Sequence, residues 1–168
     1  MKKLDKRRRR EGKTNYAKRL RLLKSEMPRL IVRKTNKYII IQIIESENAK
    51  DKVIITLSTK ELLKYGWPLK KSGSLKSLAA AYITGILMAK KSLNKKIKKV
   101  ILDSGLIPST KGSRVYAVVK GVSEGGLTIP VNDKILPDDE KINRYDFFEK
   151  IKNKIADVKW KNRKKITK

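Results

Sequence analysis

The side chains that could carry chemistry in this sequence are few, because the chain contains neither cysteine nor histidine. Without cysteine the chain can have no disulfide, thiolate metal site or cysteine nucleophile. Without histidine it has no Ser-His-Asp triad and little basis for a transition-metal site. Carboxylates remain, and a metal-dependent nuclease needs two or three of them converging on Mg²⁺. Asp103 ends a predicted strand, but Glu45 and Asp133 would have to reach it from distant segments. We therefore expect structural roles for these acids and no enzymatic activity, with a nuclease as the alternative.

The loop over residues 105–113 lies between a predicted strand and a predicted helix, where a phosphate-binding loop would lie. A P-loop needs Gly-Lys-Ser/Thr after four residues from its first glycine, whereas this loop has Thr110-Lys111-Gly112 there. Nucleotide hydrolysis is therefore not predicted. The backbone N–H groups of Ser113 and Arg114, with Lys111 beside them, would still suit an RNA phosphate.

Positive charge dominates the sequence, with 44 Lys and Arg against 16 Asp and Glu and a formal net charge of +28. It is densest in residues 1–24, which hold twelve Lys and Arg against two acids. Like charges at this density repel one another unless an anionic partner neutralises them, and a polyphosphate is the obvious partner. Tyr16, Leu20 and Leu23 interleave with the bases at helical spacing, which indicates a helix that packs and binds at once. The alternative is a general basic protein that binds duplex DNA or an anionic membrane surface.

The chain is long enough for one ordinary domain with extensions. Apolar residues gather between residues 28 and 131, so we expect a basic N-terminal arm and helix (1–27), an α/β core (28–131) and a C-terminal segment (132–168). That last segment holds an acidic loop, a helix and a basic tail. The longest apolar run, 78–89, is too short to cross a bilayer. We predict a cytoplasmic location, with no membrane, cofactor or small-molecule substrate.

Three strands are predicted at the start of the core. Segments 29–35 and 38–45 are rich in Ile and Val and flank Thr35-Asn36-Lys37, where Asn36 could adopt the left-handed conformation of a tight hairpin turn. A third strand at 53–57 would complete an antiparallel meander. Arg29 and Arg33 lie four positions apart, hence on one strand face, where their guanidiniums could bridge phosphates.

Helices are predicted before and after these three strands in the sequence. An extended arm over 1–13 precedes a helix capped by Thr14 that runs to about residue 25. After the third strand we expect a short helix with Ser58 and Glu61 as a capping box, ending at Gly66, and a loop over 68–74.

The second half of the core is predicted to alternate helix and strand. The expected elements are a buried helix at 75–94, a strand at 100–102, a helix at 113–124 ending at Gly125-Gly126, and a last helix capped by Asp138 that carries Phe147 or Phe148, Ile151, Ile155 and Val158. The tail beyond it contains Trp160, which could anchor the helix or stack on a base. The strand–helix–strand crossover favours a parallel pair, so the predicted fold class is α/β, with a mixed β-sheet and packed helices.

Several longer motifs resemble one known family. The stretch RRRREGKTNYAKRLRLLKS, followed by PRLIVRKTNKYIIIQI, resembles the universal large-subunit ribosomal protein numbered eighteen in its archaeal and eukaryotic form. LKYGWPL, AAAYITGILMAKKSL and VILDSGLIPSTKGSRVYAVVKGVSEGGLTIP continue the resemblance in the same order, over roughly residues 7–140. The chain departs from the family pattern at Tyr38, in the loop 69–74 and at Lys76-Ser77-Leu78.

The resemblance implies more than composition does. It implies a core of the ribonuclease-H-like, translational-machinery type and no enzymatic activity. It also implies a structural protein that binds 5S rRNA in the central protuberance, touches the 23S-type rRNA and has neighbouring large-subunit ribosomal proteins as partners.

The residues expected to contact RNA lie in the basic arm and its helix, in the first hairpin, and in the loop before the 113–124 helix. They are Arg7, Arg8, Arg9, Arg10, Gly12, Lys13, Thr14, Tyr16, Arg19, Arg21, Lys24, Arg29, Arg33, Lys34, Asn36, Lys37, Ser109, Thr110, Lys111, Ser113 and Arg114.

Overall fold

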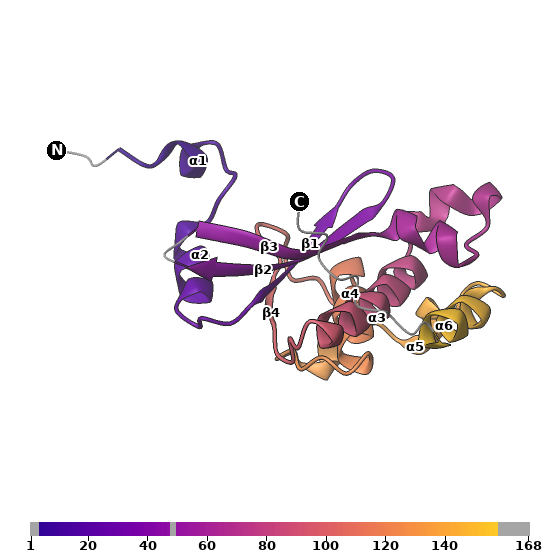
Figure 1. The fold of residues 1–168 in the computed structure, drawn as a ribbon. Helices are drawn as coiled ribbons and strands as arrows, with labels where there is room; N and C mark the ends of the chain where they lie inside the picture. Colours follow the sequence, from indigo (N-terminus) through magenta and orange to yellow (C-terminus); the bar gives the residue numbers. More distant parts are fainter. Residues whose placement is uncertain (1–3, 48–49, 158–168) are drawn as a thin grey trace, which may run out of the picture.

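A four-stranded mixed β-sheet with helices packed on it forms the body of the protein (Figure 1). The computed structural model describes residues 4–47 and 50–157. The strands are β1 (Arg29–Lys34), β2 (Ile39–Glu47), β3 (Lys50–Ser58) and β4 (Ile101–Asp103). The α-helices are α1 (Arg7–Arg10), α2 (Tyr16–Leu23), α3 (Leu78–Asn94), α4 (Arg114–Glu124), α5 (Asp139–Ile142) and α6 (Phe148–Asp157). Three 3₁₀ helices complete the described chain: η1 (Thr59–Tyr65), η2 (Leu69–Lys76) and η3 (Asp133–Ile135).

The strand order is β3-β2-β1-β4. β1 pairs antiparallel with β2, β2 pairs antiparallel with β3, and β1 pairs parallel with β4 through Arg29↔Ile101 and Ile31↔Asp103. The predicted meander, the parallel pair and the mixed α/β class are therefore confirmed. The parallel pair matters for function because it brings β4, far away in sequence, beside the first half of β1.

The turn between β1 and β2 is closed by a side chain. The Thr35 hydroxyl donates to the carbonyl of Tyr38 (2.6 Å) and accepts from the Tyr38 N–H (3.0 Å), and the Thr35 N–H donates to the same carbonyl (2.9 Å). Among the described non-glycine residues only Glu26 and Lys96 have positive φ. The prediction that Asn36 adopts the left-handed conformation is therefore wrong. The Thr35 side chain closes the turn instead.

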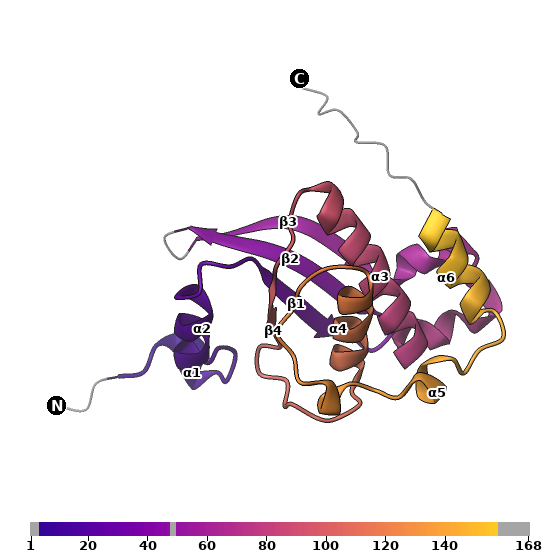
Figure 2. The same cartoon turned by 90° about the horizontal axis from the view of Figure 1, so that it is seen from below.

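Helices α3 and α4 lie side by side against one face of the sheet (Figures 1 and 2). Two glycines allow the close approach: a Cβ on Gly85 would lie 2.4 Å from the carbonyl oxygen of Val118, and one on Gly121 would lie 2.1 Å from that of Tyr82. Most of α3 is buried, as its apolar sequence predicts. The core thus lies between the sheet and this helix pair.

Several helix boundaries in the structure differ from the predicted ones, and local contacts explain the differences. The predicted loop 68–74 forms η2, so α3 begins at Leu78, where Ser77 Oγ accepts from the Ala80 N–H (3.2 Å). At the end of β3, Ser58 Oγ caps the helix by accepting from the Lys60 N–H, and Glu61 pairs with Lys91 (3.0 Å), so the predicted Ser58–Glu61 capping box does not form. The predicted helix ending at Gly66 is therefore present in 3₁₀ form.

The predicted last helix is divided into two. The one-turn helix α5 follows Asp138, and α6 begins ten residues later at Phe148. Phe148, Ile151 and Ile155 are buried in the core, as the helical spacing predicts. The predictions for Val158 and Trp160 lie outside the described residues.

The basic arm is partly folded and lies at the opposite end of the molecule from α6 (Figures 1 and 2). The expectation of an extended arm over 1–13 is wrong for the described part. Arg7–Arg10 form one helical turn, and the chain then reverses through Gly12 (φ 61°), with the N–H groups of Lys13 and Thr14 donating to the carbonyl of Arg8. α2 is capped by Asn15, whose Oδ1 accepts from the Lys18 N–H (3.1 Å), because Thr14 Oγ1 instead accepts from Arg8 Nε (3.0 Å).

Candidate nucleic-acid interface

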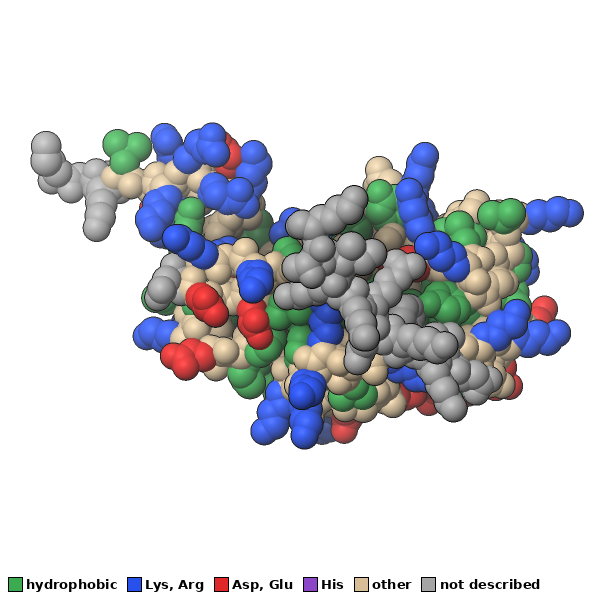
Figure 3. All heavy atoms as spheres, in the orientation of Figure 1, with side chains coloured by type: hydrophobic (Ala, Val, Ile, Leu, Met, Phe, Trp, Pro, Cys, Tyr) green, Lys and Arg blue, Asp and Glu red, His purple; other side chains and the backbone are tan. Residues whose placement is uncertain are grey.

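A cleft of about 430 Å³ lies between the basic arm, the face of the sheet that carries Arg29, Ile31 and Ile44, and the loop after β4. We call it the arm cleft. Its lining comprises Arg8, Lys13, Thr14, Arg19, Arg29, Ile31, Val32, Arg33, Lys34, Ile44, Asp51 and residues 103–107. Basic side chains gather around α1 beside it (Figure 3). Six cationic side chains thus face a cleft with two carboxylates, so its lining is net positive.

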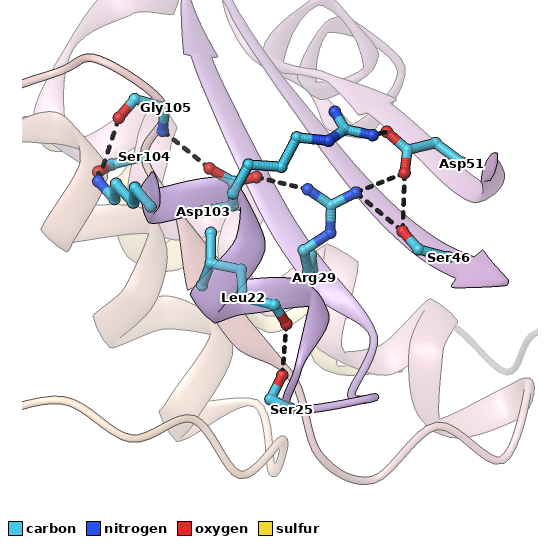
Figure 4. Close-up of polar contacts among 10 residues, drawn as sticks. Leu22, Ser25, Arg29, Ser46, Asp51, Asp103, Ser104 and Gly105 are labelled. Atoms are coloured by element: carbon cyan, nitrogen blue, oxygen red, sulfur yellow. Dashed lines mark hydrogen bonds and ion pairs between the residues drawn. The ribbon is translucent and has the colours of Figure 1, made fainter. Parts of the chain in front are cut away.

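One buried arginine organises the inner end of the arm cleft (Figure 4). The Arg29 side chain is 2% exposed. Its Nη1 donates to Asp103 Oδ2 (2.8 Å), and its Nη2 donates to Asp51 Oδ1 (2.7 Å) and to Ser46 Oγ (2.9 Å). This network joins β1, β2, β3 and β4, which are the four strands of the sheet.

Arg29 was expected to bind phosphate, and these contacts give it a different role. Arg29 and Arg33 both line the arm cleft, as their spacing predicts, but only Arg33 is exposed. The guanidinium of Arg29 is already occupied by two carboxylates in a site that water barely reaches. Direct phosphate binding by Arg29 is therefore not supported, because a phosphate would have to displace both acids.

Asp51 ties α2 to this network. Its Oδ2 accepts from Arg19 Nη2 (3.0 Å), while its Oδ1 accepts from Ser46 Oγ (2.7 Å) and from Arg29. Burial opposes ionisation of Asp51, but the hydrogen bond from Ser46 and the charges of Arg29 and Arg19 outweigh it and lower the pKa of Asp51 below its ordinary value. The carboxylate is therefore charged at neutral pH and holds both arginines.

Lys18 fixes the opposite wall of the arm cleft. Its Nζ donates to Ser104 Oγ (2.8 Å) and to the carbonyl of Gly105 (3.1 Å), while the Gly105 N–H donates to Asp103 Oδ1 (2.9 Å). Gly105 has φ 58°, which favours glycine at this turn. No residue of α2 is fully buried and Leu20 is 57% exposed, so these polar contacts of Lys18 help to hold the helix in place.

Three cations that line the arm cleft have no acidic partner in the part of the chain that the structure describes. Among the described residues, the side chains of Arg33 and Lys34 form no hydrogen bond or ion pair, and Arg8 bonds only to the hydroxyl of Thr14. Lys13 pairs with Glu11 (2.8 Å), and both side chains are accessible. Such uncommitted cations on a preformed surface are suited to the phosphates of a nucleic acid.

A second cleft, of about 560 Å³, opens at the N-terminal ends of α3 and α4. We call it the helix-end cleft. Its lining comprises Lys34, Ser77, Leu78, Ala79, Thr110, Gly112, Ser113, Arg114, Lys141, Arg144 and Tyr145. Lys34 lines both clefts, so the two surfaces adjoin.

The loop before α4 supplies one side of the helix-end cleft. The predicted free N–H of Ser113 is wrong, because it donates to the carbonyl of Thr110 (3.2 Å). Ser113 Oγ is buried without a partner among the described residues. Two other predicted residues of this loop do not line the cleft. Lys111 is exposed elsewhere on the surface, and the Ser109 hydroxyl shares a hydrogen bond with Tyr116.

The remaining predicted site residues are spread over the surface. Gly12 and Tyr16 line a smaller hollow of about 290 Å³ beside the arm cleft, with Lys6 4.9 Å above the Tyr16 ring. Asn36 and Lys37 line a separate hollow near η2. Arg7, Arg9, Arg10, Arg21 and Lys24 are exposed.

Sequence reasoning missed residues that act through distant partners. Lys18, Ser46 and Asp51 position the arm cleft, yet no local pattern marks them. Leu106 gave no clear signal either, because it stands next to Ile107 in the loop and only the structure shows that it is 53% exposed. Lys141 and Arg144 reach the helix-end cleft from the C-terminal segment.

The acids considered for a nuclease do not converge. Asp103 is bonded to Arg29, Glu45 lines another hollow with Lys50 and Lys52, and Asp133 begins η3. Within residues 4–47 and 50–157, no group of three or more His, Cys, Asp or Glu could hold a metal ion. The same described residues contain no helix long and apolar enough to cross a membrane.

The fold and the two clefts define a basic α/β protein with surfaces suited to a polyanion. Comparison with known proteins identifies the family. Residues 2–99 and 95–132 match the family model described as ribosomal large subunit proteins 60S L5 and 50S L18. The chain therefore belongs to this family of large-subunit ribosomal proteins.

Individual relatives agree with the family match. The chain is 52% identical over 136 residues to large ribosomal subunit protein uL18 of Korarchaeum cryptofilum, an alignment that covers 81% of this chain and 68% of that protein. It is 44% identical over 135 residues to the uL18 protein of Methanosphaera stadtmanae, covering 80% of this chain and 68% of the relative. The uL18 protein of Aeropyrum pernix is 44% identical over 137 residues, an alignment that covers 81% of this chain and 62% of that protein.

Family membership confirms several expectations from the sequence. The chain is a structural component of the translation machinery, its family is not an enzyme family, and a cytoplasmic location follows from the ribosomal role. The family match ends at residue 132, so residues 133–157 extend beyond it although they pack on the core.

Proposed function

We propose that this protein binds 5S rRNA and helps attach it to the large-subunit rRNA in the central protuberance. The observation that carries the proposal is the arm cleft, where Arg8, Arg33 and Lys34 have no acidic partner among residues 4–47 and 50–157 and lie on a surface fixed by Arg29. The RNA-contacting residues named from the sequence are part of this proposal, except that Arg29 positions the surface and does not bind phosphate.

We propose that the two clefts bind different partners. The arm cleft would hold 5S rRNA, and the helix-end cleft or the C-terminal segment would face 23S-type rRNA or neighbouring large-subunit proteins. Charge supports this division, because Lys141, Arg144 and Arg114 line the helix-end cleft together. Segments 1–27 and 28–131 then form the arm cleft together, and segments 28–131 and 132–168 form the helix-end cleft.

Binding of labelled 5S rRNA at several salt concentrations tests the proposal. If six to ten phosphates are contacted, affinity should fall by about 10³–10⁵ between 50 and 200 mM salt, a range calibrated on DNA. An RNA of equal length and shuffled sequence and a duplex DNA are the competitors. Equal affinity for all three would favour the general polyanion binder, and weak binding with no salt dependence would refute the proposal.

A matched pair of variants localises the binding surface. Changing Arg7, Arg8, Arg9 and Arg10 together to Gln should weaken 5S rRNA binding strongly. The control changes Lys64, Lys70, Lys98 and Lys99 to Gln, which removes the same charge from exposed positions that line neither cleft nor the hollow at Asn36 and Lys37. Chemical footprinting of 5S rRNA with each protein then identifies the nucleotides that the arm protects. Equal losses from both variants would show that only net charge matters.

A further inference from the structure

The apolar part of the arm cleft has no role in phosphate binding. Ile31 and Ile44 form part of its lining and are 8% and 6% exposed, so each keeps a little surface facing the cleft. Leu106 stands in the wall with 53% of its surface exposed. A cleft built only to attract phosphates would gain nothing from these side chains.

Leu106 also separates two cationic hollows. It lines the arm cleft on one side and, on the other, the smaller hollow that contains Tyr16 and Arg9. An exposed apolar side chain between cations fits a ligand whose flat apolar part is flanked by negative charges. A nucleotide has this chemistry, since its base has an apolar face and its phosphates lie on either side.

The shape of the cleft favours an unpaired nucleotide over a helical one. In an A-form duplex the bases are stacked inside, and the protein meets phosphates, sugars and the edges of a shallow groove. Only a base that has left its stack can enter a cleft and lie against leucine and isoleucine. The volume of about 430 Å³ is within the roughly 300–1,000 Å³ typical of small-molecule sites.

The wall that carries Leu106 is fixed before any ligand arrives. Lys18 binds the loop through Ser104 and Gly105, and Asp103 holds the Gly105 N–H while it pairs with Arg29. The acids of the cleft are therefore engaged internally, and the charges that face a ligand are those of Arg8, Arg33 and Lys34. Because the side chains of this wall are already ordered, little conformational entropy of the protein is lost when a ligand binds.

We propose that the arm cleft binds one unstacked nucleotide of the RNA, with its base against Leu106 and the Ile31–Ile44 floor and its flanking phosphates at Arg8, Arg33 and Lys34. This inference rests on the proposed RNA-binding function and adds a preference for unpaired nucleotides. The basic arm provides attraction to any RNA, and the apolar wall distinguishes a loop or bulge from a continuous duplex.

Leu106→Ser in the full-length protein tests the inference, because Leu106 is exposed and its replacement should leave the fold intact. The matched control is Leu69→Ser, which changes an equally large leucine that is 76% exposed in η2, away from both clefts. Binding is measured to 5S rRNA and to a blunt RNA duplex of similar length. We expect Leu106→Ser to weaken 5S rRNA binding about five- to tenfold, because serine buries less apolar surface against the base, and to leave duplex binding unchanged. Arg33→Gln should weaken both and reduce the salt slope by about one.

The outcomes separate this inference from the function on which it rests. If the unmodified protein does not prefer 5S rRNA, the proposed function fails. If it does, but Leu106→Ser behaves like Leu69→Ser or weakens duplex binding equally, the nucleotide pocket is wrong and the function stands. If a free nucleoside monophosphate binds at millimolar concentration, and Leu106→Ser weakens that binding, yet the nucleotide does not compete with 5S rRNA, the pocket proposal is also overturned. A 2-aminopurine at an unpaired, protected position of 5S rRNA should change its fluorescence with the unmodified protein and not with Leu106→Ser.

Discussion

Replacement of Arg29 by methionine should destabilise the protein without weakening its RNA contacts directly. The change removes a buried guanidinium that is 2% exposed and bonds to Asp51, Asp103 and Ser46. Methionine retains much of the apolar length of the arginine stem, so the main loss is charge and hydrogen bonding. The matched control is Arg33→Met, the same substitution on the same strand at an exposed position.

The geometry sets the size of the effect. Removing one partner of a buried ion pair costs about 3–5 kcal/mol, since it leaves an uncompensated charge. Here the carboxylates are 29% and 15% exposed, so water solvates them partly when Arg29 is gone, and Nε of Arg29 has no partner in the described structure. We therefore expect a loss of about 3 kcal/mol in the free energy of unfolding, which corresponds to a fall in Tm of about 6–12 °C for a chain of this length.

Urea and thermal unfolding followed by circular dichroism measure this loss. Arg33→Met should stay within about 0.5 kcal/mol of the unmodified protein, yet it should lower 5S rRNA affinity and reduce the salt slope by about one. Arg29→Met, assayed well below its Tm, should keep the full salt slope. The reasoning is refuted if the two variants lose similar stability, or if Arg29→Met alone lowers the salt slope. Adding Asp51→Asn and Asp103→Asn to Arg29→Met should recover part of the loss, because the stranded charges are then removed.

Further predictions concern packing, pH and the C-terminal helix. Gly121→Ala should cost about 1–3 kcal/mol in urea unfolding, because its Cβ would lie 2.1 Å from the Tyr82 carbonyl oxygen, whereas Gly73→Ala, with open space around it, should be nearly neutral. The lowered pKa of Asp51 means that its contribution to stability is full above the ordinary pKa of about 3.9 and is lost as pH falls through the lowered value. Acid unfolding should therefore be steeper in the unmodified protein than in Asp51→Asn; parallel curves would contradict this. Lys90→Met should speed amide exchange in α6 roughly fivefold and spare the sheet, since Lys90 Nζ donates to the last carbonyls of that helix. Unchanged exchange in α6 would show that apolar packing alone holds it.

The sheet could be predicted because its signals are local. Runs of Ile and Val with intervening turn residues define strands within a few positions, and the crossover length indicates the parallel pair. Two of the errors came where two neighbouring residues compete for one role. Thr14 and Asn15 both suit a helix cap, and contact with Arg8 decided that Asn15 caps α2. Likewise Thr35, next to Asn36, closed the hairpin turn with its own hydroxyl.

Composition and pattern by themselves determined that this protein is basic, lacks cysteine and histidine, and has one α/β core flanked by charged segments. They also identified the segments that could meet RNA, since charge density is visible in the sequence. Only the tertiary structure decided which of two arginines on the same face of β1 is available to a ligand. Arg29 is engaged by Asp51 and Asp103, which lie 22 and 74 positions away, while Arg33 has no such partner among the described residues. The physical reason is that the environment of a charge depends on groups brought together by folding, which the neighbouring sequence does not contain.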